Sequence, residues 1–278
     1  MSPEYSSTVN VARDYYNSRD ADNFYFTIWG GEDIHIGLYE SEEMSIFEAS
    51  RRTVEMMAGM ARNLDKNSRV IDFGAGYGGA ARHLAKTYGC KVVALNLSEA
   101  ENERDRQMNR EQGVDDLIDV VDGSFEDVPY PDTSFDLVWS QDAILHSGNR
   151  TKVIEEVARV LKPSGEFIFT DPMMADNCPK DVLQPIFDRI HLETLGSPGF
   201  YRETCARYGL EEVEYKDFHP QLPVHYARVL KETERREDEL RNVVSQEYID
   251  HMKKGLRHWV DGGSNGHLEW GIFHFVKK

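Results

Sequence analysis

The segment VWSQDAILHS (138–147) combines an amide, a carboxylate and an imidazole at the point where an apolar run ends. Gln141 and Asp142 come directly after that run, and His146 lies four residues beyond Asp142. A helical turn would place Asp142 and His146 on one face. A carboxylate attracts a cationic amine, and a carboxylate or an imidazole can accept its proton. The segment therefore predicts an acid–base site at the end of a strand.

A glycine-rich turn, DFGAGYGG (72–79), also follows an apolar run and precedes a helical pattern. Its glycines allow a tight turn and the close approach of a ligand. In a parallel sheet such a turn usually holds a nucleotide-like ligand at the carboxyl edge. Gly74, Gly76 and Gly79 satisfy GxGxxG, so a nicotinamide-dependent oxidoreductase is one alternative. Asp72, two residues before the first glycine, stands where a dinucleotide-binding strand is usually apolar.

Strands and helices must position these residues, and their patterns alternate from residue 69 onward. Strands are expected from 69 and at 91–97, 117–121, 135–141, 165–171, 211–218 and 268–278. Helical patterns cover 8–29 (one or two helices), 42–63, 79–88, 98–112, 150–161, 180–207 and 222–257. Alternation of this kind predicts an α/β fold, a seven-stranded and mostly parallel sheet with helices on both faces.

The 278 residues, 40% of them hydrophobic, suit one large domain, so we expect residues 1–278 to form a single unit. Within it, 65–175 would form the ligand-binding core and 1–40 an N-terminal helical lid. Residues 176–265 would supply the helical cover and a further strand, and 266–278 the last strand.

The net charge of -17 argues against nucleic acid and anionic membranes as partners, because both repel an acidic protein. Three scattered cysteines without a Cys/His cluster predict neither a disulfide framework nor a metal site. The first residues lack a signal-peptide pattern, and no apolar run is long enough to span a membrane. We therefore expect a cytoplasmic protein; whether it forms a homo-oligomer is left open.

The string D-x-G-x-G-x-G beginning at Asp72 resembles motif I of class I S-adenosylmethionine-dependent methyltransferases. The resemblance implies a Rossmann-like fold with S-adenosyl-L-methionine as cofactor. It implies these cofactor-binding residues: Asp72, Gly74, Ala75, Gly76, Asn96, Leu97, Ser124, Phe125 and Gln141. Two positions depart from the pattern, since Asn96 and Ser124 stand where such enzymes often carry a carboxylate. An amide or a hydroxyl can still accept hydrogen bonds there.

The string S-x-D-A-I-L-H, Ser140 to His146, resembles a stretch of phosphoethanolamine N-methyltransferases. The resemblance implies that Asp142 and His146 lie at the reacting amine and that the histidine acts with an N-terminal tyrosine. Tyr16 is our candidate for that tyrosine, with Tyr25 and Trp29 as further substrate contacts. Aromatic rings stabilise a methylated ammonium through cation–π contacts.

Longer strings, among them DADNFYFTIWGGEDIHIGLY (20–39) and HLETLGSPGFYRE (191–203), resemble the sarcosine/dimethylglycine N-methyltransferases of glycine betaine synthesis. The similarity extends from about residue 11 to 278. It implies methyl transfer from S-adenosylmethionine to sarcosine and N,N-dimethylglycine, giving betaine. An acidic protein also fits a role in osmoprotection, where salt screens its charge.

Such a substrate is a zwitterion, so its carboxylate needs an anchor, for which a guanidinium or an imidazolium is suited. The leading candidates are Arg189 and His191. The resemblance implies that the stretch DRIHLET (188–194) lies on a helix lining the substrate pocket, which favours His191. Tyr226 is a candidate for an aromatic wall. Less favoured cationic or imidazole candidates are Arg202, His225 and Arg228.

Other methyltransferase substrates remain alternatives, namely phosphoethanolamine, a tocopherol-type compound or a lipid. A phosphate substrate would need several cations in the cover, whereas 176–205 holds only Lys180, Arg189 and Arg202. A non-catalytic module that binds an adenosyl ligand is a further alternative. Whether glycine itself is accepted is left open.

Overall fold

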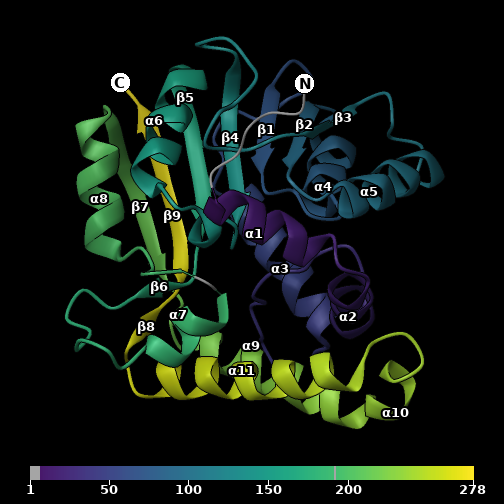
Figure 1. Cartoon of the computed structure of the whole chain (residues 1–278). Helices are drawn as coiled ribbons and strands as arrows, with labels where there is room; N and C mark the ends of the chain where they lie inside the picture. The colour runs from purple at the N-terminus through teal and green to yellow at the C-terminus, as the bar shows by residue number, and fades with distance from the viewer. Residues whose placement is uncertain (1–6, 191) are drawn as a thin grey trace.

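A central seven-stranded sheet dominates the computed structural model, which describes residues 7–190 and 192–278 (Figure 1). Its strand order is β3-β2-β1-β4-β5-β9-β7. The strands are β1 (Arg69–Phe73), β2 (Lys91–Asn96), β3 (Ile118–Asp122), β4 (Phe135–Gln141), β5 (Leu161–Thr170), β7 (Leu210–Asp217) and β9 (Gly271–Lys277). Strand β9 pairs antiparallel with β5 and β7, whereas the other pairs of this sheet are parallel. The predicted seven-stranded, mostly parallel sheet is confirmed.

The strand order reverses between β1 and β4. From β1 the chain proceeds outward through β2 to β3, then returns to β4 on the other side of β1. Phe73 of β1 is the register partner of Ser140 of β4. Both segments singled out in the sequence, the glycine turn after Phe73 and the segment after Ser140, therefore begin side by side. In open α/β sheets this reversal point is where ligands bind.

Helices cover both faces of the sheet. They are α3 (Ile46–Ala58), α4 (Gly79–Tyr88), α5 (Glu99–Glu111), α6 (Arg150–Val160) and α8 (Pro198–Arg207). Apolar residues of α3 and α4 pack with Val70 and Trp139 on one face. On the other face, residues of α6 and α8 pack with Phe73 and Phe169. Successive strand residues point to opposite faces, so the near-continuous apolar strands of the sequence serve two cores at once.

The helical stretch expected at 180–207 is two helices, α7 (Gln184–Ile190) and α8. Ser197 caps α8 by accepting a hydrogen bond from the backbone N–H of Phe200, and Pro198 begins the helix. Both residues favour a helix start and oppose an unbroken helix. Tyr201 and Cys205 of α8 are buried in the sheet core, so α8 flanks the sheet, and the expected cover is here reduced to α7.

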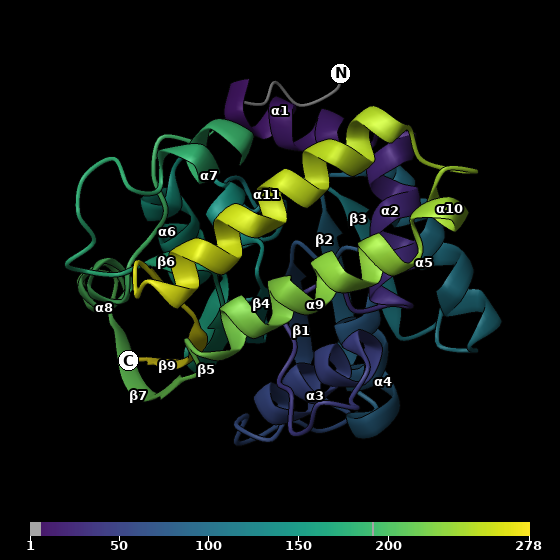
Figure 2. The ribbon, with the colours of Figure 1, turned by 90° about the horizontal axis from the view of Figure 1, so that it is seen from below.

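A layer of helices lies across the carboxyl edge of the sheet. It consists of α1 (Ser7–Tyr16), α2 (Arg19–Trp29), α7, α9 (Gln221–Arg235), α10 (Glu237–Leu240) and α11 (Gln246–Ser264). Figure 2 shows α9 and α11 side by side across this edge. The single helical region expected at 222–257 is thus three helices and continues to residue 264, with Ser245 as the N-cap of α11. No helix among the described residues is long and apolar enough to cross a membrane.

Two further boundaries differ from the sequence predictions. The helix expected at 42–63 is shorter, because Ser45 and Glu48 form a capping box that starts α3 at Ile46. The last strand, expected as 268–278, is interrupted at Trp270. Before the interruption, β8 (Leu268–Glu269) pairs with β6 (Met173–Met174) in a separate small sheet.

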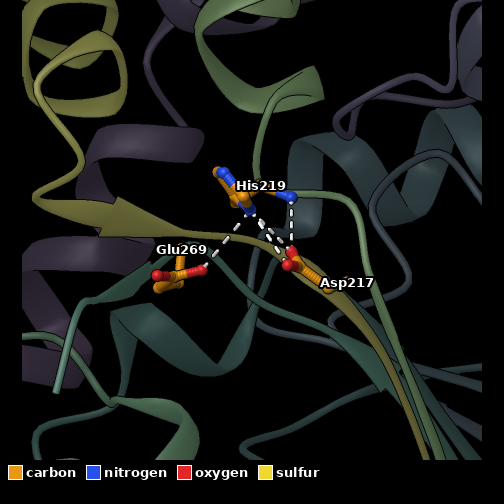
Figure 3. A group of neighbouring side chains, drawn as sticks. All are labelled: Asp217, His219 and Glu269. Atoms are coloured by element: carbon orange, nitrogen blue, oxygen red, sulfur yellow. Dashed lines mark hydrogen bonds and ion pairs between the residues drawn. The ribbon is translucent and has the colours of Figure 1, made fainter.

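A polar group closes the turn from β7 into α9. His219 donates its backbone N–H to Asp217 Oδ1 at 2.9 Å, and its ring Nδ1 lies 2.9 Å from the same oxygen (Figure 3). Glu269 Oε2 of β8 lies 3.9 Å from that ring nitrogen. The three side chains could lie around a cation, since their ligand atoms fall within 4.8 Å of one another. Because Asp217 already contacts the backbone N–H and the ring Nδ1 of His219, we interpret the group as a hydrogen-bonded turn that fixes the start of α9.

Candidate active site

The glycine turn brings backbone close to the end of β4. Gly74, Gly76 and Gly78 have φ values of 75°, 54° and 73°, the left-handed region that glycine adopts without strain. A Cβ on Gly74 would lie 2.4 Å from the Cβ of Ala143. Only a residue without a side chain therefore lets the turn approach the segment that carries Asp142.

A cavity of about 650 Å³, which we call the edge cavity, opens at this point. Six of the nine predicted cofactor-binding residues line it: Gly74, Gly76, Asn96, Leu97, Phe125 and Gln141. Gln141 Oε1 accepts a hydrogen bond from Trp139 Nε1 at 3.0 Å, whereas its buried Nε2 has no partner among the described residues. An orphaned donor of this kind is expected where a ligand supplies the acceptor.

Three predicted residues do not line the edge cavity. Asp72 is 2% exposed, and burial raises the pKa of its carboxyl well above the usual value, with Asp105 and Asp33 adding to the rise. Ser124 is buried, and its hydroxyl accepts a hydrogen bond from the Glu126 N–H at 3.1 Å within a turn. Ala75 packs against the core on the α4 face. Asp72, Ser124 and Ala75 are therefore placed to support the wall of the edge cavity, and not to contact a ligand bound in it.

The sequence analysis missed Glu101, which lines the edge cavity from the first turns of α5. Its Oε2 accepts a hydrogen bond from Nδ2 of Asn96 at 2.8 Å. Burial raises the pKa of Glu101 to about 7, although the hydrogen bond from Asn96 opposes the shift. The carboxylate that the sequence lacks at Asn96 is thus supplied five residues later. A glutamate on the helix after an amide-ended strand was the available signal.

A second cavity of about 900 Å³, which we call the cover cavity, lies between the helical layer and the sheet edge. Four of the predicted substrate contacts line it: Tyr25, Trp29, Arg189 and Tyr226. The fifth, His191, lies outside the described residues. The predicted catalytic residues Tyr16, Asp142 and His146 line both cavities and so form part of the boundary between them.

Tyr16 of α1 and His146 of the 3-10 helix η1 (Ile144–His146) meet at this boundary. The Tyr16 hydroxyl lies 2.9 Å from His146 Nε2. Burial lowers the pKa of His146 to about 4, assisted by the positive charges of Arg150 and Arg189. Burial also raises the pKa of Tyr16. At neutral pH both groups are therefore uncharged, and either the Tyr16 hydroxyl or the imidazole N–H donates the hydrogen bond between them.

Asp142 is held by two hydrogen bonds. Its Oδ2 accepts from the Ile36 N–H at 2.7 Å, and its Oδ1 accepts from Nε1 of Trp270 at 2.8 Å. Burial raises its pKa. Its φ of 50° is left-handed, so Asp142 precedes η1 instead of sharing an α-helical turn with His146. The predicted turn geometry is wrong, but both side chains still line the same boundary.

Aromatic rings form much of the cover cavity. Tyr25 packs against Trp29 with ring centroids 5.1 Å apart, and Tyr226 stacks on Trp259 at 5.1 Å. Tyr15, which the sequence analysis did not select, also lines this cavity. Its hydroxyl lies 2.8 Å from the hydroxyl of Tyr248. The cavity therefore presents several ring faces and phenol oxygens to a ligand.

Arg189 differs from the other cationic candidates. It is the one lysine or arginine among the described residues that line the cover cavity. Arg202 pairs with Glu212, and Arg228 donates to backbone carbonyls of residues 41, 42 and 44; neither lines the cavity. His225 does line it, but burial lowers the pKa of its ring to about 3. Arg189 is thus the fixed positive charge available to an anionic ligand group.

Fold and site together define a class I S-adenosylmethionine-dependent methyltransferase. Residues 71–169 match the family described as "Methyltransferase domain". Because the chain is a methyltransferase, the alternative of a nicotinamide-dependent oxidoreductase is excluded.

The chain belongs to the sarcosine/dimethylglycine N-methyltransferase family. It is 64% identical to the sarcosine/dimethylglycine N-methyltransferase of Halorhodospira halochloris, over 97% of this chain and 96% of that protein. It is 57% identical to the glycine/sarcosine/dimethylglycine N-methyltransferase of Actinopolyspora halophila, over 97% of this chain and 48% of that protein. The crystal structure of a Galdieria sulphuraria protein, 43% identical, superposes with a TM-score of 0.90, covering 95% of this chain and 99% of that one.

The residues of the edge cavity fit S-adenosylmethionine. Asn96 and Glu101 offer hydrogen-bonding groups for a ribose diol, and Phe125 offers a ring for a purine. Gly74 and Gly76 bring bare backbone to the cavity wall, which the amino-acid end of the ligand can approach closely, and Gln141 supplies an unpartnered donor.

Proposed function

We propose that this chain transfers methyl groups from S-adenosylmethionine to the amine of sarcosine and of N,N-dimethylglycine, and thereby produces glycine betaine. The observation that carries this proposal is the common boundary of the two cavities, where Tyr16, Asp142 and His146 lie. S-adenosylmethionine supplies an electrophilic methyl group when it is bound. The cover cavity would hold the amine on the other side of that boundary.

The amine must lose a proton before it can react. An alkylamine with a pKa of about 10 is mostly protonated at neutral pH and has no free lone pair. We assign the attraction of the cation to Asp142, whose two hydrogen bonds fix its carboxylate. We assign proton uptake to the pair of Tyr16 and His146, because the pair is uncharged and hydrogen-bonded to each other. Placing the amine against the methyl group would contribute much of the remaining rate.

The carboxylate of the substrate would pair with Arg189. No carboxylate among the described residues forms an ion pair with Arg189. A guanidinium binds a carboxylate through two parallel hydrogen bonds, which fixes orientation as well as adding affinity. Tyr25, Trp29 and Tyr226 would surround the methylated ammonium, each contributing about 0.5–2 kcal/mol by cation–π contact.

The reaction has a natural end. A quaternary ammonium has no lone pair, so methylation stops at betaine, and the enzyme needs no device that counts methyl groups. We further propose that the reaction takes place in the cytoplasm and serves osmoprotection. A phosphate-bearing amine is a poorer fit, because Arg189 is the one fixed cation among the described residues that line the cover cavity.

Mass spectrometry of the products tests this function. The enzyme would be incubated with S-adenosylmethionine and, separately, glycine, sarcosine, dimethylglycine and phosphoethanolamine. We expect dimethylglycine and betaine from sarcosine, and betaine from dimethylglycine. Methylation of phosphoethanolamine but not of dimethylglycine would overturn the proposal, and the glycine reaction would show whether the unmethylated amino acid is accepted.

A further inference from the structure

Arg189 reaches the cover cavity past helix α11. Its Nη2 lies 2.9 Å from Sδ of Met252, a weak acceptor that cannot neutralise it. Burial acts to lower the pKa of Arg189, but the phenol groups of Tyr15, Tyr25, Tyr248 and Tyr226 outweigh that effect and leave it raised. The guanidinium is therefore charged, and its position in the cavity determines which ligand groups it can reach.

Gly255 lies on α11 opposite the middle of the Arg189 side chain, three residues after Met252. A Cβ at this position would lie 2.2 Å from Nε, 2.3 Å from Cδ and 2.6 Å from Cζ of Arg189. Contacts below 3.0 Å require a shift, and since all three atoms belong to the flexible end of Arg189, this side chain would move at little cost and carry the guanidinium with it.

Helix geometry alone does not explain this glycine. Gly255 is in the interior of α11, and its φ is not in the left-handed region. Glycine is less favourable than alanine inside a helix, because it loses more conformational freedom on folding. The residue is therefore explained by the space that Arg189 occupies.

We propose that Gly255 is a specificity-determining position: its missing side chain lets Arg189 enter the cover cavity where a substrate carboxylate can meet it. This inference rests on the function proposed above. Gly255 itself would be a positioning residue, since it acts through Arg189. The class of ligand that it selects is the N-methylated amino acid, as opposed to an N-methylated amine without a carboxylate.

The variant Gly255→Ala tests the inference by steady-state kinetics and binding. We expect KM for dimethylglycine to rise roughly 10- to 100-fold, the loss typical of a misplaced charge-assisted hydrogen bond. The Kd of S-adenosylhomocysteine, measured by calorimetry, should change less than about twofold, because the edge cavity is not altered. The matched control is Gly262→Ala on the same helix, where a Cβ would meet Leu268 Cδ1 at 2.9 Å and which does not line the cavity.

Inhibition by betaine and by choline separates positioning from a general structural effect. Both carry a trimethylammonium group, but only betaine has a carboxylate. Gly255→Ala should raise the inhibition constant of betaine by the same factor as KM and leave that of choline nearly unchanged. Equal weakening of both inhibitors, or a KM within twofold of wild type, would overturn the inference.

A second pair of variants covers the case in which Gly255→Ala folds poorly. In the Arg189→Ala background the obstructing side chain is absent. Adding Gly255→Ala should therefore neither raise KM nor lower the melting temperature. A further loss in the double variant would show that the alanine collides with something other than Arg189 and would refute the proposal. If instead the wild-type enzyme does not methylate dimethylglycine at all, the proposed function fails, whatever Gly255 does.

Discussion

The two cavities are built by different means. The edge cavity is formed largely by backbone turns at the ends of β1, β2 and β4, and the strand order places these turns next to one another. The cover cavity is formed by side chains of α1, α2, α7, α9 and α11, which are far apart in the sequence. The first arrangement suits a ligand shared across a superfamily, and the second suits the particular acceptor. Changes in each region should therefore have separable effects.

The largest effect should come from the boundary between the two cavities. Asp142→Asn keeps a residue type that tolerates the left-handed backbone but removes the charge that holds the amine. We expect kcat/KM for dimethylglycine to fall about 10²- to 10³-fold, because removing one partner of a buried charge pair costs about 3–5 kcal/mol. Binding of S-adenosylhomocysteine should remain near wild type. A variant with full turnover would remove Asp142 from the chemistry.

A change confined to the cover cavity should act on the acceptor alone. Arg189→Met retains much of the volume but loses the positive charge, so KM for dimethylglycine should rise roughly 10- to 100-fold. Arg202→Met is the control, because that arginine pairs with Glu212 on the surface. If both variants gave the same kinetics, Arg189 would not be the carboxylate anchor.

A change in the edge cavity should weaken binding of the methyl donor and leave binding of the acceptor unaffected. Glu101→Ala removes the carboxylate beside Asn96, so affinity for S-adenosylmethionine should drop about tenfold, the usual loss for one hydrogen bond to a charged group. KM for dimethylglycine, measured at saturating methyl donor, should stay close to wild type. A selective loss of dimethylglycine affinity would contradict the division between the cavities.

The smallest effect is expected in the pH dependence of the free energy of unfolding. The pKa of His146 is lowered to about 4, below its value of about 6.5 in an unfolded chain. Between these values the unfolded state binds more protons, so acidification destabilises the folded state. From pH 7 to 5.5 the cost for this group is about 1 kcal/mol.

Urea titrations at both pH values would measure this cost. His146→Gln should lose less stability than wild type over the same interval. Identical pH dependence in the two proteins would mean that the ring is not buried as a neutral group.

The contrast between the cavities also explains how far the sequence could be interpreted. The glycine turn and the ends of β2 and β4 could be located from local patterns, because strand, turn and helix signals fix the backbone there. Gly74 and Gln141 were found in this way, whereas Asn96 was named through the resemblance to class I methyltransferases. Glu101 was missed because its position depends on how α5 turns back over the end of β2.

The cover cavity was less accessible to sequence reasoning. Tyr25 and Trp29 were selected through resemblance to known enzymes, and Arg189 as a cation suited to the carboxylate of the implied substrate. Tyr15 and Trp259 were not selected. Their proximity depends on the packing of separate helices, which no local pattern encodes. The Asp142–His146 spacing suggested an α-helical turn, but Asp142 adopts a left-handed backbone and meets Ile36 and Trp270. Tertiary contacts thus override the local preference.

The position of helix α1 affects whether the intermediate is released between successive methyl transfers. Its residues Ala12 and Tyr16 line both cavities, and Arg13 and Asn17 near its C-terminal end bind Glu99 at the start of α5. We expect S-adenosylhomocysteine to leave by a movement of this helix, and because α1 also lines the cover cavity, the same movement would uncover the partly methylated amino acid. Synthesis from sarcosine should therefore be distributive: free dimethylglycine should accumulate in solution before betaine appears, instead of remaining bound between the two transfers.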